Sequence, residues 1–151
     1  MAYWLLKSEP DAYSIDTLAR EGAAQWDGVR NWTARNNLRA MREGELGFFY
    51  HSSCEPPGIA GVLRIVREAY PDASQFDPAS TYFDPRSTVE KPRWYAPDVD
   101  FVEKLARFVP LSELRATAGL EGMELLRAVR LSVQHVTDEE WKIITALAET
   151  A

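Results

Sequence analysis

One stretch of this sequence combines residue types that suit an anionic, planar ligand. Residues 29–42, VRNWTARNNLRAMR, contain four arginines and no acidic residue, and Trp26-Asp27-Gly28 lies directly before them. Guanidinium groups attract anions, indole rings stack on flat rings, and amide groups form hydrogen bonds with base edges. The stretch therefore points to a nucleotide or a nucleic acid as the ligand.

A second set of polar groups ends the first apolar segment. The apolar residues 3–6 are followed by Lys7, Ser8 and Glu9, and Pro10 then turns the chain. A carboxylate accepts hydrogen bonds from amino groups, and a hydroxyl both donates and accepts. These side chains could converge on a ligand, but an ordinary strand exit with Lys7 in solvent explains them equally well.

Four of the five tryptophans fall into two groups. Trp4 and Trp141 belong to apolar patterns, which predicts core positions, whereas Trp26 and Trp94 lie in irregular segments. A loop tryptophan beside arginines can stack on a base and contribute about 1–3 kcal/mol. Trp26 and Trp94 are therefore candidate stacking rings, and closure of the open end of a sheet is the alternative.

Three arginines are candidate contacts for phosphate groups. Arg35, Arg39 and Arg42 recur at helical spacing and would share one face of a helix over residues 34–42. The alternative is a solvated helix face on which they pair with Glu43 or Glu45, an arrangement that adds little to stability.

Metal and nucleophile chemistry find little support in the sequence. His51 and His135 lie far apart, and Cys54 has no second cysteine with which to form a metal site. Neighbouring residues on a strand point to opposite faces, so His51 could not activate Ser52. We therefore expect no metal, no cofactor and no catalytic triad.

The charge balance limits the kind of nucleic-acid contact. The chain of 151 residues has a formal net charge of −6 and a pI near 5.0. Residues 68–151 hold nine basic and fifteen acidic groups, which accounts for the whole net charge. Extended non-specific binding to a duplex needs many neutralised phosphates, so the composition disfavours it. A nucleotide, or a short strand that crosses one basic edge, agrees with it.

Composition also bears on size and location. One cysteine excludes an internal disulfide and indicates a reducing compartment, and residues 1–10 do not resemble a signal peptide. No apolar run approaches the roughly 20 residues that span a bilayer. We therefore expect one cytoplasmic domain over residues 1–151, a monomer that does not bind membranes.

The apolar patterns predict an α+β domain. Residues 70–95 form a long irregular excursion, a kind of segment that often carries function. Short helices around a mixed sheet, curled or barrel-like, are the expected architecture. Strands are expected at 3–7, 45–50, 59–67, 99–107 and 130–136, and helices after the caps Ser14, Thr33, Ser112 and Thr137 and over 119–128.

Ordered blocks over nearly the whole chain resemble the EVE domain family. The family often has Gln-Pro after its Leu-Ser-Val strand, where this chain has Gln134-His135, so a contact at that point need not be shared. The matching blocks are YWLLKSEP (3–10), WDGVRN (26–31), ARN (34–36), FFYHS (48–52), PGI (57–59), YPD (70–72), DP (84–85), PRW (92–94) and LSV (131–133).

The resemblance implies a PUA-like fold, a mixed-sheet pseudo-barrel with peripheral helices. It also implies a reader of modified nucleobases, chiefly modified cytosines in DNA, in which Trp26 is a wall of the pocket. The other implied pocket residues are Lys7, Ser8, Glu9, Val29, Arg30 and Asn31 in the lining, with His51, Ser52 and Trp94 near the rim.

The sequence thus predicts a non-catalytic module that binds a modified base in DNA or RNA, or a nucleotide-like small molecule. Two alternatives stay open. One is a small hydrolase or nuclease that acts on nucleotides, with Glu9 or Asp27 as general base. The other is a protein-interaction module that uses residues 70–95.

Overall fold

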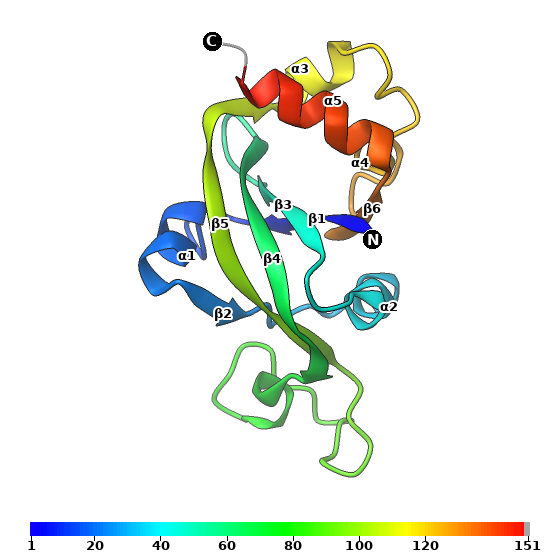
Figure 1. Ribbon diagram of the computed structural model, residues 1–151. Helices are drawn as coiled ribbons and strands as arrows, with labels where there is room; N and C mark the ends of the chain where they lie inside the picture. Colours follow the sequence, from blue (N-terminus) through cyan, green and yellow to red (C-terminus); the bar gives the residue numbers. More distant parts are fainter. Residues whose placement is uncertain (150–151) are drawn as a thin grey trace.

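The computed structural model of the chain describes residues 1–149 and arranges them as an α+β fold (Figure 1). The last two residues of the domain predicted over 1–151 lie outside the described residues. The elements of residues 1–149 are β1 Tyr3–Ser8, α1 Ile15–Glu21, β2 Ala23–Gln25, α2 Trp32–Ala40, β3 Leu46–His51, β4 Gly58–Pro71, the 3-10 helix η1 Ala73–Phe76, β5 Tyr95–Pro110, α3 Leu111–Ala116, α4 Glu124–Arg127, β6 Val133–Val136 and α5 Asp138–Glu149.

The strands form one mixed sheet in the order β2-β5-β4-β3-β1-β6. β1 runs parallel to β3 and antiparallel to β6, and the other neighbours are antiparallel. The long strands β4 and β5 curve across the molecule, with helices around them (Figure 1). The predicted mixed sheet with peripheral helices is confirmed. β2 and β6 are its two edges, so the sheet is not a closed barrel.

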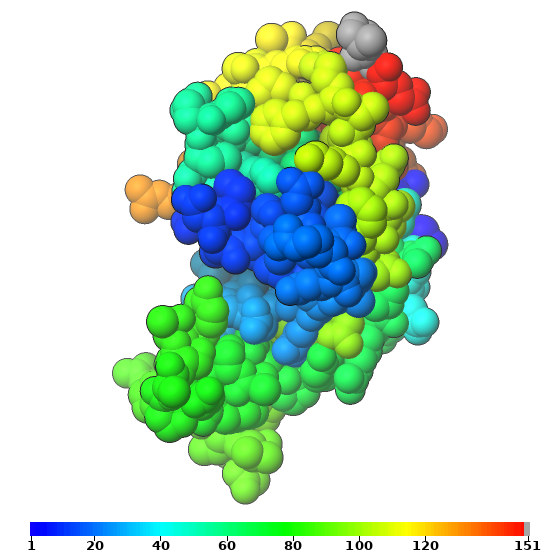
Figure 2. Space-filling model, turned by 90° about the vertical axis from the view of Figure 1, so that its left-hand side faces the viewer, coloured from blue at the N-terminus to red at the C-terminus, as the bar shows by residue number. Residues whose placement is uncertain are grey.

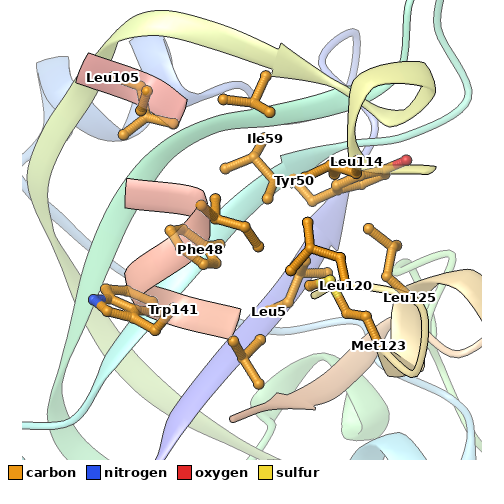
Figure 3. Close-up of a cluster of buried hydrophobic side chains, with 14 of the residues drawn as sticks. Leu5, Phe48, Tyr50, Ile59, Leu105, Leu114, Leu120, Met123, Leu125 and Trp141 are labelled. Carbon is orange, nitrogen blue, oxygen red and sulfur yellow. The ribbon is translucent and has the colours of Figure 1, made fainter. Parts of the chain in front are cut away.

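β1 has an apolar core on each of its faces. Leu5 belongs to one buried cluster, which includes residues of α3, α4 and α5, whereas Trp4 and Leu6 belong to a second cluster with α1 and α2. Figure 3 shows the first cluster, in which Leu5, Phe48 and Trp141 lie close together. Successive side chains of a strand point to opposite faces, which explains why residues 3–6 of β1 are all apolar. Trp4 and Trp141 are both buried, as predicted.

Two helix starts are confirmed. Ser14 caps α1, where its hydroxyl accepts a hydrogen bond from the Thr17 N–H at 3.1 Å. Thr137 and Glu140 form the capping box of α5: the Glu140 carboxylate accepts from the Thr137 N–H at 2.9 Å, and the Thr137 hydroxyl accepts from the Glu140 N–H at 3.1 Å. In both caps the two bonded residues are only three positions apart in the chain, so the local sequence is sufficient to identify them.

Helix α2 differs from the prediction at both ends. Asn31 rather than Thr33 is its N-cap, because the Asn31 Oδ1 atom accepts a hydrogen bond from the Ala34 N–H at 2.9 Å. The helix ends before Arg42, because the Glu45 carboxylate accepts from the Arg42 N–H at 2.8 Å and stabilises a turn there. The arginine face is therefore shorter than predicted.

Several other strands and helices begin or end at residues that differ from the prediction. β4 continues to Pro71 and β5 begins at Tyr95, so both strands enter the segment predicted to be irregular, where they pair with each other. The helix predicted over 119–128 is only α4, the strand predicted over 130–136 is only β6, and Pro110 rather than Ser112 precedes α3. Strand length depends on the partner strand, which the local sequence does not reveal.

Residues 72–94 form an excursion beyond the sheet, drawn in green at the bottom of Figure 1. Its centre is the fully buried amide of Gln75, whose Nε2 atom donates to the Asp72 and Trp94 carbonyls, both at 2.8 Å. The Gln75 Oε1 atom accepts from the Ser87 hydroxyl at 2.8 Å. A satisfied polar network thus gives this segment a defined conformation without a large apolar core of its own.

Within residues 1–149, none of the helices has the length and apolar character needed to cross a membrane.

Candidate functional site

A recess of about 570 Å³ opens where the end of β1 meets the loop after β2; we call it the main recess. In Figure 2 the dark-blue segment after β1 lies above the light-blue loop after β2 and the green excursion. Parts of the chain that are distant in sequence therefore share one site. Its lining is Lys7, Ser8, Glu9, Ala12 and Tyr13, then Gln25, Trp26, Asp27, Gly28, Val29 and Arg30, and finally Tyr82 and Ser132.

The end of β1 forms one wall of the main recess. The Ser8 hydroxyl donates to the Tyr13 carbonyl at 2.7 Å, and the Lys7 ammonium donates to the Val129 carbonyl at 2.8 Å. Burial lowers the pKa of Lys7. The exposed Glu9 side chain makes no hydrogen bond or ion pair within residues 1–149, so its carboxylate can accept from a ligand.

Trp26 forms a second wall. It is 7% exposed, and its ring meets the Phe49 ring edge-on, with centroids 5.3 Å apart. Its backbone N–H donates to the Pro97 carbonyl at 2.9 Å, which holds the residue beside the edge strand β2. Trp26 therefore packs on the core and also borders the main recess, so the two interpretations from sequence are compatible.

Two polar residues flank Trp26 in the chain. Burial, and then the nearby Asp72 carboxylate, raise the pKa of Asp27. The Gln25 Nε2 atom is buried and has no hydrogen-bond partner within residues 1–149. A buried donor without an acceptor costs free energy, so a ligand acceptor at this point would be favoured.

Gly28 allows the excursion to approach the main recess. Its φ of +81° lies in the left-handed region, and a Cβ atom here would be 2.7 Å from the Cζ atom of Tyr82. The Gly28 N–H also donates to the Asp72 carboxylate at 2.8 Å. A larger residue would strain the backbone and displace the Tyr82 ring from the recess.

Hydrogen bonds from Arg30 hold the excursion against the loop after β2. Its guanidinium donates to the Val29 and Tyr82 carbonyls, the Ser74 hydroxyl and the Asp72 carboxylate at 2.8–3.1 Å. All five of its N–H groups thereby have acceptors. Burial alone would raise the pKa of Asp72, but hydrogen bonds from Ser74, Gly28 and, to a smaller extent, Arg30 hold it below its ordinary value. Arg30 lines the recess, but in this arrangement it has no free donor for a phosphate.

A second recess, of about 490 Å³, borders the same end of β1. It shares Lys7, Ser8, Glu9 and Ser132 with the main recess. Ser52, predicted at the rim of the pocket, lines this second recess instead. The rest of its lining is Tyr50, Ser53, Pro57, Leu111, Val129 and Arg130.

Three predicted pocket residues line neither recess. The Asn31 side chain caps α2, and the His51 Nε2 atom accepts from the Ile15 N–H at 3.2 Å, in a place where burial lowers the pKa of His51. Trp94 is 6% exposed, and its Nε1 atom donates to the Asp84 carboxylate at 2.7 Å. All three side chains stabilise nearby backbone or the excursion.

Arg35 and Arg39 lie on a basic, aromatic surface, which we call the arginine–tryptophan surface and define as Trp32, Arg35, Arg39 and Arg93. The Arg35 Cζ atom is 4.5 Å from the Trp32 ring centroid, and the Arg93 Cζ atom is 5.0 Å from it. Burial, and then the charge of Arg39, lower the pKa of Arg35. Trp32 is 46% exposed. Cations are thus gathered beside an accessible ring.

Trp94 connects this surface with the main recess. The Trp32 and Trp94 rings are stacked with centroids 4.5 Å apart, and the Arg30 Cζ atom is 5.4 Å from the Trp94 centroid. Arg42, by contrast, lies past the end of α2, where its exposed guanidinium is 3.9 Å from the Glu68 carboxylate. The predicted arginine face therefore divides, and Arg42 is separate from it.

Several lining residues were missed or undervalued from the sequence. Gln25, Asp27 and Gly28 directly flank Trp26, and this adjacency was a usable signal. Tyr82 gave only the weak signal of an aromatic residue in a long excursion. Ser132 gave only the signal of the LSV block, because its place beside β1 depends on the pairing of β6 with β1.

The described residues do not suggest metal chemistry or an activated thiol. Among residues 1–149, no three His, Cys, Asp or Glu side chains form a group that could hold a metal ion. Cys54 is a free thiol, and burial raises its pKa. A raised pKa leaves less of the nucleophilic thiolate near neutral pH.

The sequence pattern of one family matches almost the whole chain. The match is to the EVE domain and covers residues 2–147. The chain belongs to the EVE domain family. This EVE domain is 46% identical to mouse thymocyte nuclear protein 1 over 167 residues, with 98% of this chain and 74% of the relative covered.

Two solved structures closely resemble this EVE domain. A protein from Pseudomonas putida matches with a TM-score of 0.94 and 53% identity, over 97% of this chain and 99% of that one. Human THYN1 protein, solved in complex with DNA containing 5-methylcytosine, matches with a TM-score of 0.95 and 44% identity, over 100% and 99%. These neighbours confirm the PUA-like fold expected of an EVE domain.

The departure from the family pattern at Gln134-His135 lies away from the main recess. The His135 ring packs against Trp4, with centroids 4.6 Å apart. The Gln134 Nε2 atom donates to the Ala128 and Leu131 carbonyls, both at 2.9 Å. Neither residue lines the recess, so this EVE domain keeps the lining that its other motifs supply.

Proposed function

We propose that this EVE domain is a non-catalytic reader of a modified nucleobase in nucleic acid, and that the base enters the main recess beside Trp26. One observation carries the proposal: an indole, two carboxylates, a hydroxyl and an unpartnered amide meet in a recess of about 570 Å³. This volume is within the usual range for small-molecule sites. The similarity to human THYN1, solved with 5-methylcytosine DNA, makes a modified cytosine in DNA the first candidate.

The polar lining favours a base that carries an amino group. The Glu9 and Asp27 carboxylates are acceptors for an exocyclic amine, and the Gln25 amide is a donor for a ring nitrogen or carbonyl. Cytosine and adenine carry such an amine, whereas thymine carries a carbonyl at the same edge. A base that leaves the buried Gln25 donor unpaired is disfavoured, because an unpaired buried polar group is costly.

The apolar lining supplies the remaining contacts. Stacking on the Trp26 ring is worth about 1–3 kcal/mol, which offsets part of the few kcal/mol that extrusion of a base from a duplex costs. Val29 adds an apolar surface that suits a methyl group on the base. Contact with Val29 therefore favours a base with an added methyl group over the plain base.

The strand that carries the base would follow the arginine–tryptophan surface. Arg35 and Arg39 are the candidate phosphate contacts, and Trp32 is an exposed ring beside Arg35. Arg30 acts as a positioning residue, since its hydrogen bonds hold Tyr82 and the excursion in place. Phosphate contacts orient a strand, and base contacts then select it.

Fluorescence anisotropy with labelled DNA duplexes that differ at one base tests the proposal. The series contains cytosine, 5-methylcytosine, 5-hydroxymethylcytosine, N6-methyladenine and thymine at that position. At least one modified cytosine should bind about tenfold more tightly than cytosine, a difference of about 1.4 kcal/mol. Glu9→Gln should weaken binding of the cytosine and modified-cytosine duplexes relative to the thymine duplex, because both kinds of cytosine carry the amine that Glu9 would accept from, whereas Glu139→Gln, an exposed change on α5, should leave all affinities unchanged. Equal affinity for every duplex would contradict the proposal, and turnover of the DNA would support the nuclease alternative.

A further inference from the structure

The second recess lies against the main recess at the end of β1. The two share Lys7, Ser8, Glu9 and Ser132, so one stretch of backbone separates them. In Figure 2 the dark-blue segment after β1 has the turquoise β3–β4 loop above it and the orange residues near position 130 projecting at its left. The Lys7–Glu9 segment is therefore a wall common to both recesses, and a ligand that spans this wall could occupy both.

The side chains of the second recess favour an anion. Arg130 makes no hydrogen bond or ion pair within residues 1–149, and the Lys7 ammonium is bonded only to the Val129 carbonyl. The Lys7 Nζ atom is also 5.7 Å from the Tyr50 ring centroid. The lining holds two cations against one carboxylate, that of Glu9. Its net charge is thus positive in a chain that is acidic as a whole.

Hydroxyl groups complete this lining. Ser52 and Ser53 follow β3 directly, and the Ser52 N–H donates to the Ser8 carbonyl at 3.0 Å, which holds the loop against β1. Ser53 has a φ of +53°, a left-handed conformation that is uncommon for residues other than glycine and is enriched at ligand sites. Cations with hydroxyl donors are the usual partners of a phosphate.

We propose that the second recess binds the phosphate next to the base held in the main recess, with Arg130 as its principal charged contact. The inference rests on the proposed function and adds to it. The domain then recognises a base together with one of its own flanking phosphates, on the opposite side of the Lys7–Glu9 wall from the main recess. An isolated nucleoside would lack this contact and bind more weakly.

Chemically modified DNA tests this inference. Duplexes with one 5-methylcytosine are made with a neutral methylphosphonate at either the 5′ or the 3′ linkage of that nucleotide. For one of the two linkages, loss of the charge should weaken binding to the wild type about tenfold. Arg130→Gln should weaken binding to natural DNA by a similar factor. The matched control Arg127→Gln removes another exposed arginine, on α4, outside the recess lining.

The decisive result is the combination. If Arg130 contacts that phosphate, Arg130→Gln with the methylphosphonate duplex should bind no more weakly than either change alone. If the two changes together weaken binding by the product of their separate factors, the inference is overturned. It is also overturned if Arg130→Gln and Arg127→Gln lose equal affinity for natural DNA. In both cases the preference for 5-methylcytosine over cytosine would persist, so the proposed function would stand. Absence of any preference for a modified base would instead overturn the proposed function, and the inference with it.

Discussion

At the residue scale, the side chains best able to meet a ligand are those that the protein leaves without partners. Within residues 1–149, the Glu9 carboxylate accepts no hydrogen bond and the Gln25 Nε2 atom donates none. Both residues line the main recess. Arg30, Asn31 and His51 lie in other matching blocks, and their polar atoms already bind the protein. The matching blocks thus contain both side chains with free polar groups and side chains that position the backbone.

Replacement of Trp26 should weaken both the fold and the binding of DNA. Trp26→Ala removes a buried ring, which should cost about 3–5 kcal/mol of stability, and it removes about 1–3 kcal/mol of stacking from binding. Trp26→Phe should recover part of each. Trp141→Phe is the control, because Trp141 lies in the other core cluster and should affect stability alone. Denaturant titration and anisotropy separate the two effects. A folded Trp26→Ala variant with wild-type affinity would exclude stacking on this ring.

Asp27→Asn should raise stability near neutral pH. Burial and the Asp72 carboxylate raise the pKa of Asp27, so the ionised form is unfavourable in the folded state. The protonated form gains stability as pH falls through this raised pKa, and the gain is lost as pH rises through it. The difference in melting temperature between Asp27→Asn and wild type should therefore shrink from about pH 8 to about pH 4. A difference that grows at low pH would show that the carboxylate is stabilising.

At the element scale, the loop after β2 matters because it brings the excursion to the recess. Gly28→Ala should lower both stability and binding, since the new Cβ atom would meet the Tyr82 ring at 2.7 Å. Gly22 is the control, because its φ of +84° is also positive and no atom lies within 4 Å of a Cβ there. Gly22→Ala should cost about 1–3 kcal/mol of stability through backbone strain alone and leave DNA affinity unchanged. Equal losses of affinity in both variants would contradict a role for Tyr82.

Helix α2 supplies the second prediction at this scale. Arg35→Gln and Arg39→Gln should each lower affinity for all duplexes alike and reduce the slope of log affinity against log salt by about 1. Arg42→Gln should leave the slope almost unchanged, because Arg42 lies beyond the helix beside Glu68. Titrations from about 50 mM to about 200 mM salt would measure the slopes. A slope that responds only to Arg42→Gln would place the strand elsewhere.

The elements that the sequence predicted well are those that depend on local signals. The caps at Ser14 and Thr137 and the apolar strand β1 were identified because their chemistry lies within a few residues. The ends of β4, β5 and α2 were misplaced because they depend on distant partners. Glu45, for example, ends α2 with a carboxylate that also accepts from the Trp4 indole at 2.9 Å.

At the scale of the whole molecule, the site is a product of the sheet order. β1 lies between β3 and β6, so its end meets the loop after β3 and the segment before β6, which line the second recess. The main recess forms on the same end, against the loop after β2 and the excursion. The motifs indicated that Lys7, Glu9 and Trp26 belong together, but Tyr82 and Ser132 join them only through the fold.

We propose that a base occupies the space beside Trp26, and the five tryptophans of the domain allow a direct test. Each indole N–H gives its own signal in a proton–nitrogen correlation spectrum, and single Phe substitutions assign the signals. On titration with DNA containing one 5-methylcytosine, the Trp26 signal should move most, and the Trp4 and Trp141 signals should stay in place because they belong to the buried cores. A saturated complex in which the Trp26 signal is unchanged while another indole moves would contradict the account.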